Sequence, residues 1–292
     1  MLWRKGRSSD NVEEASGGGG GGGGGFGRIH LGLGGTIIAI IIALIFPSTR
    51  GIIFGLLGGG GGMTASDTPA QIQKADSSDP QVEFVSKVLG STEDVWGAYF
   101  QQLGKQYVEP KLVLFHGQVN TACGGASAAV GPFYCPGDKR VYLDLDFFQE
   151  MSTQFHSNAD FARAYVIAHE IGHHVQDQLG IMDKEKQLEA QGEPMKGATG
   201  LSVRLELQAD CFAGVWANRS QQQLQWLQAG DVQSALGLAS AIGDNALQQA
   251  ARGTVVPDSF THGTSEQRVR WFQTGFKAGD INACDTFSAQ TL

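Results

Sequence analysis

Two histidines and a glutamate near the middle of the chain have a spacing that suits metal chemistry. The segment AYVIAHEIGHHVQDQL places His169 and His173 four residues apart, with Glu170 directly after the first. On a helix this spacing brings both imidazoles to one face, where a single zinc ion can bind both. Glu170 then lies beside the open position of the metal, where it can act as general base toward a bound water.

The competing interpretation of this segment is a polar stripe on a surface helix. It fits badly, because apolar or small residues surround the stripe, and polar groups enclosed by apolar neighbours need a partner such as a metal. These neighbours are Tyr165, Val166, Ile167, Ala168, Ile171 and Gly172.

A zinc site of this type needs a third protein ligand and leaves its fourth position for water. The arrangement His-Glu-x-x-His-x-x-Gly-x-x-His is excluded, because Gln176 and Leu179 occupy the required Gly and His positions. The segment RLELQADC offers Glu206 and Asp210, which share one helix face. We expect Glu206 to bind the metal and Asp210 to accept the free ring N–H of a liganding histidine. An exposed acidic pair is the alternative, disfavoured by the apolar run 211–216 that follows.

The chain resembles the neutral zinc metallopeptidases, a family of bacterial membrane-anchored proteins. The resemblance extends over nearly the full length and rests on WRKGRSSDNVEEA, TACGGASAAVGPFYCPGDKRVYLDLDFF, AHEIGHHVQ, ELQADCFAGVWA and HGTSEQRVRWFQTGF. It implies a gluzincin-type site in which His169, His173 and Glu206 bind one Zn²⁺ per chain and Glu170 is the base. It does not supply a substrate.

Two further histidines lie close to these motifs. His262, in FTHGTSEQR, is a candidate catalytic residue that could donate to the oxyanion of a tetrahedral intermediate. A histidine held by local hydrogen bonds near a helix N-terminus is the alternative, and it stays open. His174 points about 100° away from His173 on a helix, so we expect a structural or surface role.

The composition bounds the class of protein that these motifs serve. The 292 residues carry a net charge of −8, a pI near 5.3 and only 21 basic residues, which are scattered along the chain. Nucleic-acid binding needs clustered Lys and Arg, so it is excluded as a function. The length beyond the N-terminal region suffices for one catalytic domain.

The N-terminal region predicts a membrane anchor. Residues 1–28 are polar and Gly-rich and are expected to form a disordered cytoplasmic tail. Residues 29–57 form the predicted transmembrane anchor, since residues 31–46 are apolar without a charge. Residues 58–80 are the predicted linker, and residues 81–292 the zinc metallopeptidase domain. A cleaved signal peptide is disfavoured, because no small-residue cleavage site follows the apolar run.

The basic residues favour one orientation of this anchor. Arg4, Lys5, Arg7 and Arg28 precede the apolar run 31–46, and only Arg50 follows this run before residue 74. The positive-inside rule then predicts a single-pass protein with a cytoplasmic N-terminus and a periplasmic or extracytoplasmic domain.

All four cysteines follow the predicted span, which suggests two disulfides in an oxidising compartment. Of three possible connectivities we favour Cys123 with Cys135, which share a short Gly-rich segment, leaving Cys211 with Cys284. Four reduced thiols are the alternative. A cysteine zinc site is disfavoured, because no Cys-x₂-Cys spacing occurs.

The remaining periodicity gives the fold class. Helical spacing is predicted at 81–107, 158–179, 199–219, 232–250 and 266–277, and strands within 111–148. We therefore expect an α+β fold: a mainly helical zincin-like metallopeptidase domain with a small β-sheet, preceded by one transmembrane helix.

Two functions compete. The first is hydrolysis of peptide or protein substrates in the bacterial envelope by metal-activated water, with Glu170 as base. The second is a zinc-stabilised envelope scaffold or adaptor without turnover, which needs the ligands but not the base. The presence of Glu170 favours the enzyme. Hydrolysis of a non-peptide amide stays open, and neither the cleavage preference nor the oligomeric state is predicted.

Overall fold

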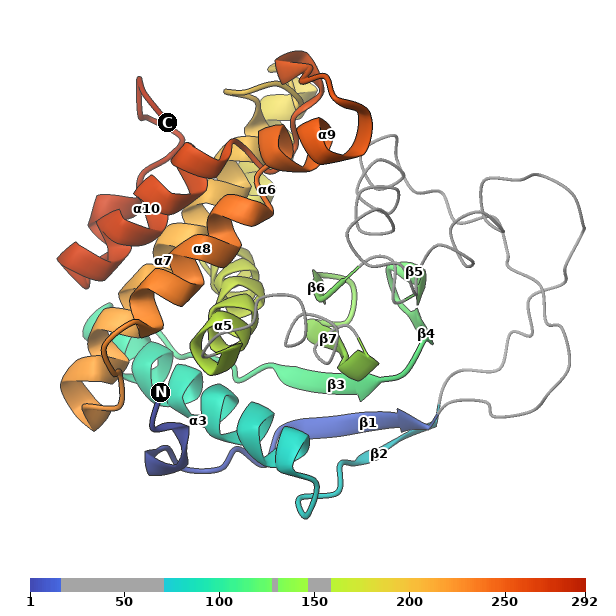
Figure 1. Ribbon diagram of the computed structural model, residues 1–292, viewed down its shortest axis with the longest axis vertical. Helices are drawn as coiled ribbons and strands as arrows, with labels where there is room; N and C mark the ends of the chain where they lie inside the picture. The colour runs from blue at the N-terminus through green and yellow to red at the C-terminus, as the bar shows by residue number, and fades with distance from the viewer. Residues whose placement is uncertain (17–70, 128–130, 147–158) are drawn as a thin grey trace, which may run out of the picture.

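The protein has an α+β fold in which helices gather on one side and a sheet lies on the other (Figure 1). The computed structural model describes residues 1–16, 71–127, 131–146 and 159–292. Within these ranges there are seven α-helices, a five-stranded sheet and a separate two-stranded hairpin. The predicted α+β class is confirmed.

The five-stranded sheet has the order β2-β1-β3-β7-β6. Its central strands β1, β3 and β7 run parallel, while the edge strands β2 and β6 are antiparallel to their neighbours. Apolar side chains fill β3 on both faces, as expected for a covered parallel strand. The strands are β1 (Val12–Ser16), β2 (Gln71–Lys74), β3 (Lys111–Phe115), β6 (Phe133–Cys135) and β7 (Arg140–Asp144), with β4 (Gln118–Thr121) and β5 (Gly124–Ser127) forming the hairpin.

Residues 1–16 are part of the domain, so the prediction of a disordered tail over 1–28 is wrong for this part. A 3₁₀ helix, Trp3–Lys5, precedes β1, and Trp3 packs edge-on against Phe84. Ser9 donates to the buried carboxylate of Glu93 at 2.5 Å, and Arg7 pairs with the same carboxylate at 2.8 Å. The polar composition predicts that the entropy cost of ordering this segment keeps it disordered. The charge-assisted bonds and the strand pairing offset that cost.

The strand pairing also bears on the predicted membrane topology. The predicted anchor, residues 29–57, lies outside the described residues, and within the described ranges no helix combines the length and apolarity needed to cross a bilayer. Residues 1–16 and the described residues from 71 onward contribute strands to one sheet and side chains to one core. The predicted topology, with the N-terminus and the domain on opposite sides of a membrane, does not account for this shared sheet. The linker predicted over 58–80 is also wrong at its end, because β2 occupies part of it.

The helices follow the predicted segments with two exceptions. They are α3 (Pro80–Gln102), α5 (Ala159–Gln178), α6 (Ile181–Ala190), α7 (Leu201–Leu224), α8 (Asp231–Ala241), α9 (Asp244–Arg252) and α10 (Ser265–Ala278). Helix α6 was not predicted. The helix predicted over 232–250 is two helices, and at the break a Cβ on Gly243 would clash with the backbone of Ser265. Thr264 caps α10 through a capping box with Gln267.

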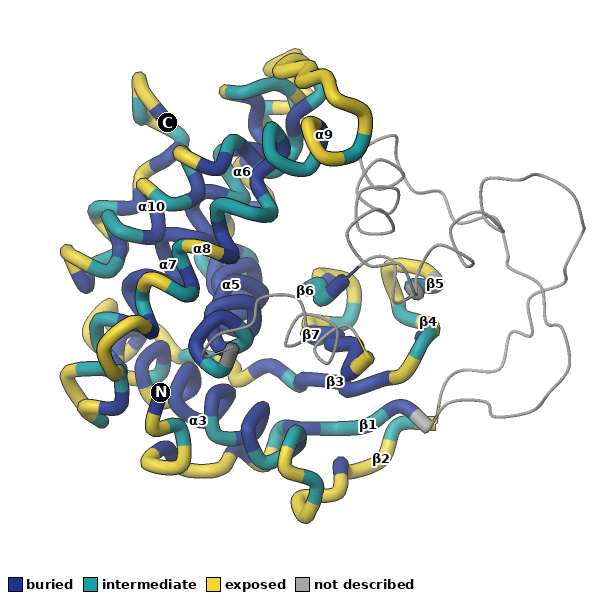
Figure 2. Tube along the Cα trace, viewed as in Figure 1, coloured by how far each residue is buried: buried dark blue, intermediate teal, exposed yellow. Residues whose placement is uncertain are grey.

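Helix α5 lies at the centre of the molecule and is buried along nearly its whole length (Figure 2). It packs against α3, α7 and α8 and against strands β6 and β7. Helices α7 and α10 cross in close contact, since a Cβ on Gly275 would clash with the Cys211 carbonyl oxygen and one on Gly214 with that of Phe272. The core therefore fixes α5, α7 and α10 relative to one another.

Two disulfides are formed, in the predicted pairing. Cys123 is bonded to Cys135 in β6, and Cys211 in α7 is bonded to Cys284 at the end of the 3₁₀ helix Ile281–Cys284. Both predicted pairs are confirmed.

Candidate metal centre

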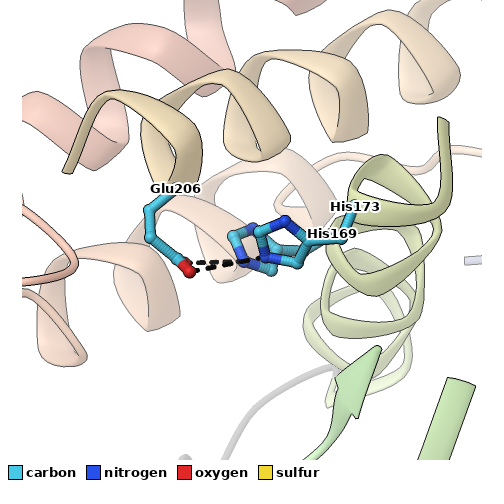
Figure 3. Close-up of side chains that lie close together, drawn as sticks. All are labelled: His169, His173 and Glu206. Carbon is cyan, nitrogen blue, oxygen red and sulfur yellow. Dashed lines mark hydrogen bonds and ion pairs between the residues drawn. The ribbon is translucent and has the colours of Figure 1, made fainter. Parts of the chain in front are cut away.

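Helices α5 and α7 bring three metal-ligating side chains together in a buried site. His169 and His173 extend from α5 toward Glu206, which extends from α7 (Figure 3). The Nε2 atom of His169 is 3.1 Å from Glu206 Oε2, and that of His173 is 3.5 Å from Glu206 Oε1. One candidate ligand atom from each residue lies within 4.8 Å of the other two. Two imidazoles and one carboxylate are the donor set of an open, catalytic zinc site.

The glycine between the two histidines makes this approach possible. A Cβ on Gly172 would lie 3.0 Å from the carbonyl oxygen of Ala209, tighter than ordinary contacts allow. Its absence lets the backbone of α7 come close to α5 at the level of the site. The same approach carries Glu206 and Asp210 to the histidines.

The far side of each imidazole faces an oxygen acceptor. His169 Nδ1 is 2.9 Å from Asp210 Oδ1, and His173 Nδ1 is 2.8 Å from Gln176 Oε1. Each Nδ1 therefore carries the proton, and each Nε2 presents its lone pair toward Glu206 when the ring is neutral. This arrangement fits a cation between the two Nε2 atoms and the carboxylate. Asp210 thus accepts the ring N–H of a candidate ligand histidine, as predicted.

The carboxylates of the site stabilise the protonated form of the candidate ligand histidines, and a bound metal would displace those protons. Burial alone lowers the pKa of His169, but Asp210 and Glu206 outweigh it and raise that pKa to about 10. Burial alone raises the pKa of Glu206, but His262 and His173 hold it well below its ordinary value. The carboxylate is thus charged, and a divalent cation would replace imidazolium protons.

A buried arginine and a tyrosine hold Asp210 in place. Arg268 of α10 donates from Nε to Oδ2 and from Nη2 to Oδ1, both at 2.9 Å, and the Tyr165 hydroxyl donates to Oδ1 at 2.5 Å. Burial alone raises the pKa of Asp210, but Arg268 and then His169 lower it to about 2. No role at the site is predicted from the sequence for Arg268 or Tyr165. Arg268 falls within HGTSEQRVRWFQTGF, a segment that carried the family resemblance.

Glu170 is buried beside the two histidines, one residue along α5. Burial raises its pKa, against the opposing charges of His169 and His173. A raised pKa makes the carboxylate a stronger base near neutral pH. The environment of Glu170 therefore suits proton transfer.

His262 lies near the cluster, on a loop that Asp244 holds. One carboxylate oxygen of Asp244 accepts the backbone N–H groups of Thr261, His262 and Gly263 at 2.7, 2.7 and 3.1 Å. His262 Nδ1 is 3.7 Å from the other oxygen, and the Glu206 charge raises the pKa of His262 against the effect of burial. The imidazole is thus held by local contacts, as one of the two predicted interpretations expects, and it senses the charge of Glu206.

Of the structural and surface roles expected for His174, the structure shows the structural one. It is buried away from the site, with Nε2 2.7 Å from the Val108 carbonyl oxygen and Nδ1 3.2 Å from the Tyr134 hydroxyl. Burial lowers its pKa, so the imidazole is neutral.

Comparison with known proteins identifies relatives of this chain. A family model described as "Putative neutral zinc metallopeptidase" matches residues 1–287. The chain is 47% identical over 291 residues to uncharacterized protein YpfJ of Escherichia coli, covering 98% of this chain and 99% of that protein. It is 45% identical over 219 residues to uncharacterized protein Rv2575 of Mycobacterium tuberculosis, covering 72% and 73%. No solved structure matches the chain.

Proposed function

Because the chain belongs to the neutral zinc metallopeptidase family, we propose that it hydrolyses peptide bonds with one zinc ion held by His169, His173 and Glu206. The observation that carries the proposal is the donor set itself. Both imidazoles have their Nδ1 atoms backed by acceptors and their Nε2 atoms directed at one carboxylate. Zinc would supply Lewis acidity toward a water and a peptide carbonyl when bound.

The chain's own residues would move the protons of the reaction. The Glu170 carboxylate accepts a proton from the attacking water and passes it to the leaving nitrogen of the cleaved bond. His262, whose Nδ1 faces Thr261 and Asp244, would donate from Nε2 in its imidazolium form to the carbonyl oxygen as negative charge develops there. Asp210 holds the ring of His169 in the tautomer that leaves Nε2 for the metal.

The place of action is proposed from the disulfides and the sheet. Two disulfides favour an oxidising compartment, so we place the folded unit in the bacterial envelope, where peptides or proteins are its substrates. Because strand β1 belongs to this unit, we propose that the N-terminus lies on the same side of the membrane as the metal centre. The apolar stretch 29–57 would attach this unit to the membrane.

The scaffold hypothesis is the alternative, and Glu170 separates the two. A scaffold has no use for a buried carboxylate beside the ligands, whereas a hydrolase needs one there.

The decisive experiment compares wild type with Glu170→Gln, using Glu189→Gln on the exposed face of α6 as the matched control. Zinc content and melting temperature should stay unchanged in all three proteins. Cleavage of unfolded protein substrates, and of envelope proteins followed by terminal proteomics, should fall by several orders of magnitude in Glu170→Gln only. Loss of zinc from this variant would make Glu170 a ligand. Unchanged cleavage would move the active site elsewhere and favour the scaffold.

A further inference from the structure

A chain of side-chain amides connects the candidate ligand His173 to the Cys211–Cys284 disulfide. Gln176 accepts from His173 Nδ1 at 2.8 Å and donates from Nε2 to Gln208 Oε1 at 3.0 Å. Gln208 in turn donates from Nε2 to the carbonyl oxygen of Cys284 at 2.9 Å. Both glutamines are buried, so water does not substitute for these bonds.

Backbone carbonyls fix the direction of every bond in this chain. A carbonyl oxygen can only accept, and Gln176 Nε2 also donates to the Leu205 carbonyl oxygen at 2.8 Å. The Gln176 amide cannot flip without facing that carbonyl with its own oxygen. Its Oε1 must therefore face His173, whose Nδ1 must carry the ring proton. Gln208 is oriented in the same way by the Cys284 carbonyl.

The disulfide holds the last acceptor of the chain. Cys211 follows Gln208 by three residues on α7, so both side chains lie on one face of that helix. The bond from Cys211 to Cys284 thus ties the acceptor carbonyl to the helix that carries the donor. The segment beyond has its own attachments, because Arg204 donates to the carbonyl oxygens of Thr286 and Ala289.

We propose that Gln176 and Gln208 are positioning residues for His173, and that the Cys211–Cys284 disulfide sets the zinc affinity of the site by holding their far end. The proposal rests on the metal centre of the proposed function. It assigns the disulfide a role in metal binding in addition to its role in stability. Strand β6 and its disulfide, Cys123–Cys135, take no part in the amide chain, and this bond supplies the matched control.

The test measures zinc affinity by chelator competition at fixed pH in wild type, Gln208→Leu, a variant with Cys211 and Cys284 both changed to alanine, and their combination. Gln208→Leu removes both amide bonds at similar side-chain volume and should weaken zinc binding about 10–100-fold. The cysteine variant should weaken it less, and the combination should bind no more weakly than Gln208→Leu alone, because all act through one chain. Changing Cys123 and Cys135 to alanine should leave the affinity unchanged.

Cobalt(II) replaces zinc in a second measurement, since its visible absorption bands report ligand geometry. The bands should shift in Gln208→Leu and stay constant in the control that lacks the other disulfide. Additive losses, or an unchanged affinity in a folded Gln208→Leu protein, would overturn the proposal. If the cysteine variant does not fold, Gln208→Leu decides alone, with thermal melting as the check on folding. Failure of wild type to bind zinc would instead contradict the proposed function.

Discussion

Replacing Arg268 by leucine removes the cation that keeps Asp210 charged in the core. The two side chains are 4% and 0% exposed, and the guanidinium makes two bonds to the carboxylate. Removing one partner of a buried pair costs about 3–5 kcal/mol, because the other charge is left without its counterion. Asp210 retains its bonds to Tyr165 and His169, so we expect about 3 kcal/mol, the lower end of this range. For a domain of this size that loss lowers the melting temperature by about 6–12 °C.

The assay is thermal and denaturant unfolding of the zinc-free protein, beside a control on the same helix. Arg270 is exposed and makes one hydrogen bond, to the Leu292 carbonyl oxygen, so Arg270→Leu should change the free energy of unfolding by no more than about 1 kcal/mol. The variant that combines Arg268→Leu with Asp210→Asn should recover part of the loss, since it leaves no buried charge unpaired. Losses that simply add in this variant, or an Arg268→Leu protein as stable as Arg270→Leu, would refute the reasoning.

Three further predictions concern the metal, the helix crossing and the topology. Because the pKa of His169 is raised to about 10, zinc must displace a proton at pH 7, and zinc affinity should rise as pH rises, about tenfold per unit for each proton released. Calorimetry in two buffers of different ionisation enthalpy should show this release, and its absence would contradict the assigned protonation. Gly275→Ala should destabilise the protein by about 1–3 kcal/mol in denaturant unfolding, because the added Cβ forces α7 and α10 apart. Gly237→Ala, whose added Cβ meets nothing within 4 Å, should be neutral or slightly stabilising. Cysteines introduced at exposed Ser8 and Gln290 should react equally with an impermeant maleimide in intact cells whose outer membrane is permeabilised. Labelling of only one of them would place the N-terminus and the domain on opposite sides.

The local part of the site could be predicted from sequence, and the part formed between distant segments could not. His169 and His173 lie one helical turn apart on the same face, and so do Glu206 and Asp210. The spacing alone therefore indicates that each pair points in one direction. Arg268 reaches Asp210 from another helix, 58 positions further along the chain. No local pattern marks an arginine that becomes buried, because arginine is ordinarily exposed.

The predicted N-terminal tail failed for a related reason. Strand β1 has the sequence VEEAS, without the apolar alternation of a half-buried strand, and it forms by pairing with β3, about a hundred residues later. The basic residues counted as a topology signal also have other partners: Arg7 pairs with Glu93 and Asp94, and Lys5 donates to the Gln225 carbonyl oxygen. Charges that serve the fold were thus attributed to membrane orientation.

The pairing of Ser16 with Gln71 in the register of β1 and β2 makes residues 17–70 the connection of a β-hairpin. The entropy of closing a connection grows only with the logarithm of its length, by about 0.6 kcal/mol per doubling, so a two-residue turn in place of these residues would lower the closure cost by about 3 kcal/mol. An expression fragment that begins at residue 71 lacks β1 and leaves the backbone edge of β3 free to pair between molecules. Joining Ser16 to Gln71 through a two-residue Asn-Gly turn instead retains all five strands, and gives crystallographers a shorter chain with the metal centre intact.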